Sequence, residues 1–412
     1  MPSGQPVERS EDRLRRTLAA GEVLFRQGDH GESAYVVESG SIEIYSERGD
    51  SSHVIATLGV NDIFGEMALL GDAARTASAR ATTRTELLVV THEHLNERLQ
   101  GADPMTRHLL RTVVLRCREM LTWMRASGAA STARQTVRVE LPGDEADSDD
   151  RTRAFQRLRT EQELELALER GEFKLYFQPI VRLKDRKVAG FEALIRWFKP
   201  GQGMVPPGEF IPVAEASPLI NRIGQWVLES SVDSLLAMEL AGGELSEPVF
   251  VTVNLSARQL SDDTLLPALA TQVARLQGRN CRIKLEVTES LMISNVVAVQ
   301  AFIVQCRELG VDVLLDDFGT GYCSLSYLHL FKVQTMKLDR SFVRGMSVSE
   351  ASEKVVRGVT RMAHDLGLTV VVEGVERLDE ADQAAGLGID YVQGFFYGRP
   401  VPLADALKRL AS

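Results

Sequence analysis

Polar residues mark the ends of a series of short apolar, β-rich runs in the second half of the chain. The marked residues are Glu192, Asn254, Glu286, Asp316 with Asp317, Lys337 with Asp339, Glu373 and Gln393. From Asn254 to Gln393 the successive intervals are 32, 30, 21, 36 and 20 residues, which fits a strand–loop–helix–loop unit. Repeated βα units close into a parallel barrel whose strand C-termini share one face, so we expect these side chains to line one pocket.

This residue set favours a cation site built from oxygen ligands. Carboxylates and an amide, with almost no His or Cys, select Mg²⁺ or Mn²⁺ rather than zinc. Neither His329 nor His364 lies at the end of a predicted strand. The adjacent Asp316 and Asp317 suit two neighbouring ions, and a lysine beside them can orient a water or stabilise charge on a phosphate. The constellation indicates phosphodiester hydrolysis.

The chain has 412 residues, and its two halves have different strand patterns, which indicates a multidomain protein. Residues 17–90 contain short alternating runs punctuated by glycine, which is typical of an antiparallel β-roll. Residues 109–124 have apolar positions at helical spacing, and we expect this helical tail either to pack on its own domain or to pair with a second chain. The βα rhythm of the second half predicts a TIM-like (β/α)8 barrel.

A polar connection is predicted between these two regions. Residues 127–150 are rich in Ala, Ser, Thr, Gly and Asp and end in the acidic run 144–150, which we interpret as a solvated linker. A helix is expected over 151–170, ended by Gly171. The predicted organisation is a β-roll domain with its C-terminal helix over 10–126, a linker and connecting helix over 127–157, and the barrel domain over 158–412.

Composition limits the classes of partner. The net charge is −10 and the pI is about 5.4, which argues against a nucleic-acid groove because phosphate binding needs a basic stripe. The four cysteines show no zinc spacing and are expected to be reduced thiols. No apolar run reaches membrane-spanning length, and residues 1–16 are too polar for a signal peptide. We therefore expect a cytoplasmic protein without DNA or membrane partners.

The second half closely resembles the EAL-domain phosphodiesterases, which hydrolyse cyclic di-GMP to a linear dinucleotide on a modified (β/α)8 barrel. The resemblance spans about Leu158 to Leu410. Its landmarks, in order, are the motifs FQPI at 177–180, EALIRW at 192–197, FIP at 210–212, NLS at 254–256, EVTE at 286–289, DDFGTG at 316–321, KLD at 337–339, EGVE at 373–376 and QG at 393–394. In this family one strand near the start of the barrel is usually antiparallel.

The resemblance also implies roles for individual residues. The implied metal ligands are Glu192, Asn254, Glu286, Asp316, Asp317 and Glu373. The implied catalytic residues are Lys337, which would hold the attacking water, with Glu373 and Glu192. Substrate contacts are implied for Gln178, Arg196, Asp339 and Gln393. Arg196 would bind a phosphate. For Asp339 a supporting salt bridge is the alternative role. Glu289, Phe318 and Gly319 match a loop that couples dimerisation to metal binding.

The first half resembles the cyclic-nucleotide-binding domains. The resemblance spans about Thr17 to Arg125 and is strongest at the phosphate-binding cassette, whose matching residues are Gly65, Glu66, Met67, Ala68, Arg75 and Thr76. A helix start after Gly65 can bind an anion, and Arg75 can bind a cyclic phosphate with two hydrogen bonds. The family implies cAMP or cGMP as ligand, with a slight preference for cAMP. A ligand-free roll used only for packing is the alternative.

Three functions are weighed on these residues. The first is a Mg²⁺- or Mn²⁺-dependent cyclic di-GMP phosphodiesterase, two ions per site, regulated by a cyclic mononucleotide and acting as a homodimer. The second is a catalytically weak or inactive sensor that signals through a protein partner; the complete catalytic set argues against it. The third is a transcription regulator, which the absence of a helix-turn-helix after the helical tail disfavours. The first is the hypothesis that the sequence supports best.

Overall fold

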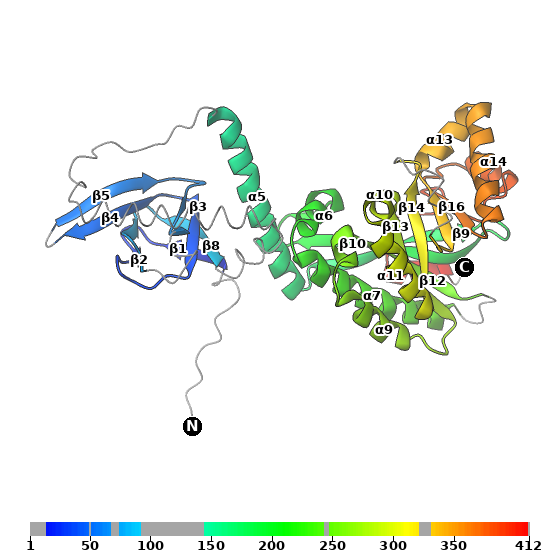
Figure 1. Ribbon diagram of the computed structural model, residues 1–412, viewed down its shortest axis with the longest axis horizontal. Coiled ribbons are helices and arrows are strands. Elements are labelled where there is room, and N and C mark those ends of the chain that lie inside the picture. Colours follow the sequence, from blue (N-terminus) through cyan, green and yellow to red (C-terminus); the bar gives the residue numbers. More distant parts are fainter. Residues whose placement is uncertain are drawn as a thin grey trace, which may run out of the picture. The chain divides into compact units, whose positions relative to one another are not determined.

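The computed structural model describes residues 14–48, 51–66, 74–91, 144–242, 247–320 and 331–410 (Figure 1). It contains two compact units, Met1–Leu166 and Ala167–Ser412, whereas the sequence predicts the barrel domain to begin at 158. Several sequence predictions lie outside the described residues: the cassette residues Met67 and Ala68, the helical tail over 109–124, the linker over 127–143 and most of the loop after Gly319.

The first unit contains two four-stranded antiparallel sheets, as expected for a β-roll. One sheet has the order β1-β8-β3-β6 and the other the order β2-β7-β4-β5. Their bounds are β1 Arg15–Leu18, β2 Val23–Phe25, β3 Ser33–Ser39, β4 Ile42–Arg48, β5 Ser51–Leu58, β6 Ile63–Phe64, β7 Ser78–Ala81 and β8 Thr85–Thr91. Alternate apolar residues of both sheets, including Leu18, Val37, Ile42 and Leu87, form one buried core between them.

A long helix, α5 (Asp144–Glu169), follows this roll in the described chain. The acidic run 144–150 forms its first turns, so the helix begins seven residues before the predicted start at 151. Acidic residues are favourable there because a helix N-terminus carries partial positive charge. Further along α5, Phe155 and Leu158 pack against Val36 and its neighbours, and the Gln162 side chain donates a hydrogen bond of 2.9 Å to the carbonyl of Val89.

The second unit is a closed eight-stranded barrel, which confirms the predicted fold class. Parallel pairing joins β10, β12, β13, β14, β15, β16 and β17, and the antiparallel strand β9 closes the ring between β17 and β10. The strand bounds are β9 Phe173–Arg182, β10 Lys187–Lys199, β12 Val249–Leu255, β13 Cys281–Thr288, β14 Asp312–Phe318, β15 Thr335–Leu338, β16 Thr369–Val372 and β17 Tyr391–Gln393. Two short strands, β11 (Gly203–Val205) and β18 (Val401–Pro402), extend the sheet.

Helices surround the barrel, which explains why its parallel strands are almost continuously apolar (Figure 1). Their bounds are α6 Pro207–Glu215, α7 Leu219–Ala241, α8 Ala257–Leu260, α9 Leu265–Ala274, α10 Glu289–Ser294, α11 Val296–Glu308, α13 Arg340–Val348, α14 Glu350–Asp365, α15 Leu378–Gly386 and α16 Leu403–Leu410. Within the described part of the chain, none of the helices has the length and apolarity needed to cross a membrane.

Candidate active site

The predicted strand-end residues lie at one end of the barrel, as their spacing requires. Strand register places Asn254 of β12 beside Glu286 of β13, and Thr288 of β13 beside Asp316 of β14. On the other side of the ring, Glu192 of β10 pairs with Gln178 of β9. Because paired residues on neighbouring strands point to the same face, the register brings these separate motifs into one pocket.

Side-chain hydrogen bonds connect the β9, β10, β12 and β17 members of this pocket. The Asn254 amide donates to one oxygen of Glu192 at 2.8 Å. The Gln393 amide donates to the other oxygen of Glu192 at 2.5 Å and to Gln178 at 3.1 Å. The carboxylate of Glu192 is therefore held by two amides from different strands, which fixes its orientation toward the centre of the pocket.

Lys337 is the cation at the centre of this cluster, and only 1% of it is exposed. Its ammonium lies 2.8 Å from Glu286, 2.5 Å from Glu373, 3.1 Å from Asp316 and 3.8 Å from Glu192. Burial alone would lower the pKa of Lys337, but the surrounding carboxylates raise it well above its usual value. The lysine is therefore positively charged and neutralises part of a costly group of buried anions.

Burial also shifts the pKa values of two carboxylates beside Lys337. It raises the pKa of Glu286 well above the usual range and that of Glu373 to about 7, although Lys337 opposes both shifts. One oxygen of Glu286, Oε1, is buried without a hydrogen-bond partner among the described residues. A single ammonium does not satisfy this many acidic oxygens, so the pocket has the donor chemistry of a site for hard cations.

Three carboxylates in particular converge closely enough to share a metal. Oxygens of Asp316, Asp317 and Glu373 lie within 4.8 Å of one another. Consecutive residues of a strand normally point to opposite faces, but Asp317 has a φ of 55°, and the β14–β15 register is irregular between Leu315 and Phe318. This left-handed residue redirects the second aspartate, so that both carboxylates reach the same pocket.

The residues assigned to the coupling loop meet at the end of β14. The buried carboxylate of Glu289 accepts a hydrogen bond of 2.8 Å from the backbone N–H of Gly319. Gly319 has a φ of 102°, and a Cβ at this position would lie 2.2 Å from the ring of Phe342, so only glycine fits. Phe318 stacks on Phe342 with ring centroids 6.5 Å apart. Glu289 and Phe342 therefore fix where the loop leaves the barrel.

Two residues that were predicted to contact the substrate, Arg196 and Asp339, lie in different surroundings. Arg196 lies further along β10 than Glu192; its guanidinium lies 5.8 Å from the ring centroid of Tyr176, and burial lowers its pKa. Asp339 instead caps helix α13, accepting a hydrogen bond of 2.9 Å from the Ser341 backbone. Burial would raise the pKa of Asp339, but this capping keeps it below its usual value. The capping contact favours the supporting role for Asp339.

A cavity of about 320 Å³ opens beside the carboxylate cluster, between β10, β12 and the helices α6 and α7. Leu194, Arg196, Glu215 and Asn254 are among the residues that line it. Glu215 was not predicted as a site residue, because nothing in its local sequence pattern indicates that it faces this cavity. The cavity is large enough for a flat ring next to the acidic pocket.

A second candidate site lies in the β-roll around Arg75. The Arg75 side chain is buried, its guanidinium stacks over Phe25 at 4.2 Å, and its Nη1 donates to the carbonyl of Gly65 at 3.0 Å. Its Nε has no hydrogen-bond partner among the described residues. Burial lowers the pKa of Arg75, while Tyr35, Asp29 and Glu66 oppose that shift. A buried guanidinium with an unpaired N–H is suited to binding an anion.

Two glycines make room for that guanidinium. A Cβ at Gly31 would lie 2.3 Å from Arg75 Nε, and one at Gly65 would lie 2.7 Å from Nη1. Thr76 is half-buried directly after the arginine, and Glu66 is the last described residue before the gap that contains Met67 and Ala68. The stacking of Arg75 on Phe25 and Tyr35 was not predicted, because aromatic residues on separate strands carry no sequence signal for a shared contact.

An eight-stranded barrel with this acidic pocket, preceded by a roll with a buried arginine, defines the class of protein. The chain belongs to the EAL family: the EAL domain model matches residues 161–400. The cyclic nucleotide-binding domain model matches residues 15–101, so the chain joins both domains, as the motifs predict.

Known proteins share one or both domains with this chain. The chain is 38% identical over 61% of its length to the cyclic di-GMP phosphodiesterase PdeR of Escherichia coli, and 36% identical over 61% to NbdA of Pseudomonas aeruginosa. It spans only 37% and 32% of the length of these relatives. A solved structure of the EAL enzyme Bd1971 in a cAMP-bound form is 30% identical, with a TM-score of 0.59, and the match covers 97% of this chain and 100% of that one.

Proposed function

We propose that this protein is a cyclic di-GMP phosphodiesterase that hydrolyses its substrate to linear pGpG with two divalent ions. The observation that carries the proposal is the complete pocket: Lys337 surrounded by the carboxylates of Glu192, Glu286, Asp316 and Glu373. Relatives with the same domain are named as cyclic di-GMP phosphodiesterases, and the EAL enzyme Bd1971 has also been solved with cAMP and cyclic di-GMP bound.

The residues fit Mg²⁺ or Mn²⁺. Glu192, Asn254, Glu286 and Asp316 would hold one ion, and Asp317 with Glu373 would complete the site of the second. Such ions supply Lewis acidity, which activates water and stabilises charge on a phosphate. The two amides that bind Glu192 orient its carboxylate before any ion arrives, and the left-handed Asp317 aims a second carboxylate at the same place.

The protein groups in the pocket would have separate roles in hydrolysis of the phosphodiester. Lys337 positions the attacking water and stabilises charge as the water oxygen forms its bond to phosphorus and the bridging P–O bond breaks; the leaving ribose oxygen takes up a proton from solvent and becomes a hydroxyl. Glu373, whose carboxylate lies beside Lys337, can accept the proton that the water loses. Arg196 binds a phosphate, Gln178 and Gln393 contact the substrate, and the 320 Å³ cavity takes a guanine.

We also propose that cAMP or cGMP bound at Arg75 regulates this activity. The unpaired Nε of the buried Arg75 supports a cyclic phosphate at this position, and Gly31 and Gly65 provide the room that the guanidinium itself needs. Bd1971, which matches nearly the whole chain, has been solved in cAMP-bound and cGMP-bound forms. Regulation requires that nucleotide binding changes the equilibrium between two states of the catalytic domain.

The direct test is hydrolysis of cyclic di-GMP by the full chain with Mg²⁺ or Mn²⁺, repeated with saturating cAMP and then cGMP. We expect linear pGpG as product, loss of turnover when EDTA removes the ions, and a change in turnover with one of the nucleotides. Turnover that ignores both nucleotides would reject the regulatory proposal alone. No turnover under any of these conditions would reject the enzyme and favour a sensor.

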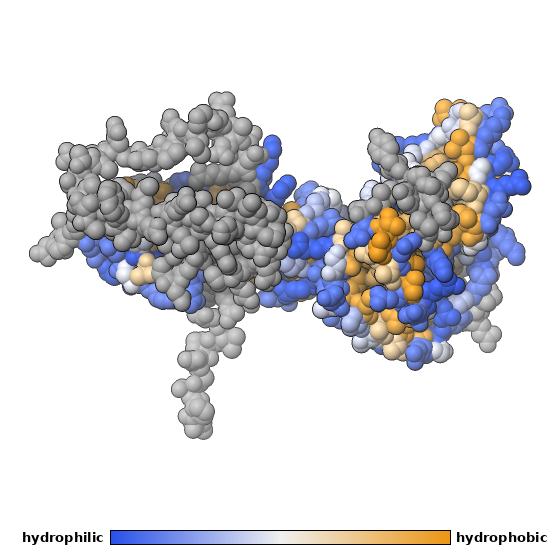
Figure 2. All heavy atoms as spheres, viewed as in Figure 1, coloured by the Kyte–Doolittle hydropathy of each residue, from blue (hydrophilic) through white to orange (hydrophobic). Residues whose placement is uncertain are grey.

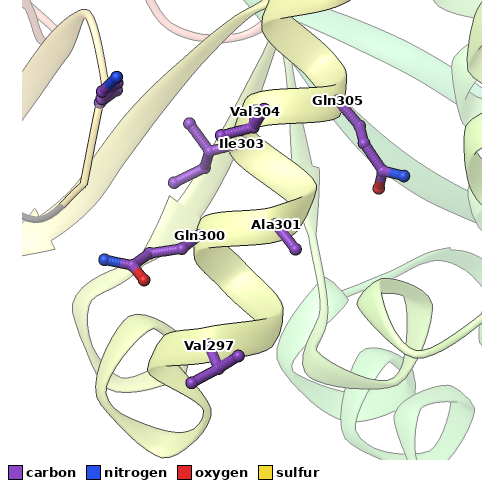
Figure 3. Close-up of a pocket in the computed structure, with 7 residues that line it drawn as sticks. Val297, Gln300, Ala301, Ile303, Val304 and Gln305 are labelled. Atoms are coloured by element: carbon purple, nitrogen blue, oxygen red, sulfur yellow. The ribbon is translucent and has the colours of Figure 1, made fainter.

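We propose a homodimer as the working state. Apolar side chains gather on the surface of the second unit around α11, where Val297 is 77% exposed and Val304 is 46% exposed (Figure 2). Figure 3 labels Val297, Gln300, Ala301 and Val304 along α11, and these residues line a hollow together with Lys332. Exposed valines on one helix favour burial against a second copy.

Light scattering of the full chain should give twice the monomer mass, and Val297→Glu should reduce the mass to that of the monomer.

A further inference from the structure

The two strands β9 and β10 form a long antiparallel hairpin that carries one side of the active site. Gln178 and Glu192 are partners in its register, and both face the interior of the barrel, where they bind Gln393. Moving away from that pair, the next partners on the same face are Tyr176 with Leu194, and then Lys174 with Arg196. Phe198 follows on this face, opposite Met204 of β11.

Four of these side chains contact each other in sequence, and we call them the hairpin ladder: Arg196, Tyr176, Phe198 and Lys174. The Arg196 guanidinium lies 5.8 Å from the Tyr176 ring centroid. The Tyr176 and Phe198 rings stack with centroids 5.9 Å apart, and the Lys174 ammonium lies 5.1 Å from the Phe198 ring. Cations and aromatic rings therefore lie along one face that starts at the phosphate-binding arginine.

The opposite face of the same hairpin has a different environment. Phe173 and Trp197 are buried there and pack against Phe210 of α6, and Phe173 also contacts Trp226 of α7. The ladder residues are not buried: Lys174 is exposed, and Arg196, Tyr176 and Phe198 are each partly exposed. Packing against the helices therefore explains the aromatic residues of the outer face but not those of the ladder.

An alternating row of rings and cations suits one kind of ligand. A nucleobase stacks on an aromatic face, while a nearby Lys or Arg pairs with the phosphate that follows it. The exposed Lys174 can leave the Phe198 ring for a phosphate, which frees that ring for a base. Met204, which is 53% exposed opposite Phe198, adds apolar surface at the outer end.

We propose that the hairpin ladder binds the second nucleotide of the substrate, the one that does not carry the phosphate being cleaved. This inference rests on the proposed function. Phe198 stacks on the second base, Lys174 pairs with its phosphate, and Tyr176 positions Arg196 between the two nucleotides. The ladder thereby selects dinucleotides over simple phosphodiesters and acts on substrate binding rather than on the chemical step.

The test compares KM and kcat for cyclic di-GMP in variants of the full chain with Mg²⁺ or Mn²⁺. Phe198→Ala should raise KM about tenfold, the loss expected for one stacked base, with kcat within about twofold of the original. Phe198→Tyr keeps the ring and should restore KM. Lys174→Ala should raise KM about fivefold, by an amount that shrinks as salt is added, because salt screens an exposed cation–phosphate pair.

Lys199→Ala is the matched control, because Lys199 lies on the same strand but packs over Trp197 on the outer face. It should leave KM within about twofold, since the strand alternation points its side chain away from the ladder. Hydrolysis of bis(4-nitrophenyl) phosphate, which has no second nucleotide, reports on the metal centre of each variant. This substrate should distinguish a lost base contact from a damaged barrel.

Three results would overturn the inference: an unchanged KM in Phe198→Ala, a KM in Phe198→Tyr as high as in Phe198→Ala, or an equal loss on both substrates. A wild-type protein that turns over neither substrate would reject the proposed function itself. Failure of the ladder alone leaves the wild-type turnover of cyclic di-GMP intact, so the two failures are distinguishable.

Discussion

Lys337→Met is expected to lower kcat for cyclic di-GMP by about a thousandfold, because one preorganised group at the reacting phosphate contributes on that scale. The same change removes the only cation within reach of Glu286, Glu373 and Asp316 among the described residues. Losing one partner of a buried ion pair costs about 3–5 kcal/mol, so the metal-free variant should unfold at a clearly lower temperature.

Two measurements separate these effects. Thermal unfolding in EDTA reports the loss of the buried charge, and unfolding with Mn²⁺ should recover part of it, because metal ions neutralise the same carboxylates. Lys184→Met is the matched control, since Lys184 is exposed in the turn between β9 and β10, and its substitution should change neither property. A Lys337→Met variant with turnover within tenfold and an unchanged unfolding temperature would contradict the assignment of Lys337.

Arg75→Ala is expected to weaken binding of the cyclic mononucleotide about a hundredfold, the size of a lost charge-assisted contact in a buried site. Arg75→Lys keeps the charge but loses the two-pronged geometry, and should weaken binding about tenfold. Isothermal titration with cAMP and with cGMP measures both changes. In the full chain, the response of cyclic di-GMP hydrolysis to the nucleotide should disappear in parallel with binding.

Arg80→Ala provides the comparison for Arg75. Arg80 also stacks on an aromatic ring, Tyr45, at 4.7 Å, but it is half-exposed and is already paired with Glu43. Its removal should change nucleotide affinity by less than about twofold, because a surface ion pair contributes little. Equal losses in the two variants would show that the roll is merely destabilised, and the assignment of Arg75 as the phosphate ligand would fall.

Spacing in the sequence predicted the barrel and the membership of its pocket, because a parallel strand must end where its neighbours end. Asn254 and Glu286 are 32 residues apart in the chain yet adjacent in the sheet. The position of Asp317 in the same pocket does not follow from strand geometry, since simple strand alternation would point its side chain away from that of Asp316. Its left-handed backbone depends on the irregular β14–β15 register, which is a property of two strands together.

Local patterns were weakest where tertiary contacts decide the outcome. The acidic run 144–150 has the composition of a linker, yet it forms the start of α5, whose later residues Phe155 and Leu158 pack on the roll. Similarly, Tyr176 and Phe198 lie on different strands, and only the hairpin register brings their rings together. Composition describes the average environment of a segment, whereas these contacts depend on a partner far away in the chain.

The ring of the barrel is closed by its first strand pairing with its last. Arg182 of β9 is the register partner of Tyr391 of β17, and Phe177 of β9 pairs with Val401 of β18. During synthesis, β9 can pair with β10 at once, but it leaves the ribosome long before β17 and β18 exist and spends that interval with its other edge unpaired. The pocket cannot be complete until β17 has been made, because Gln393, which orients Glu192, arrives with this last strand of the barrel. Chains that stop early are therefore expected to be inactive as well as prone to aggregation.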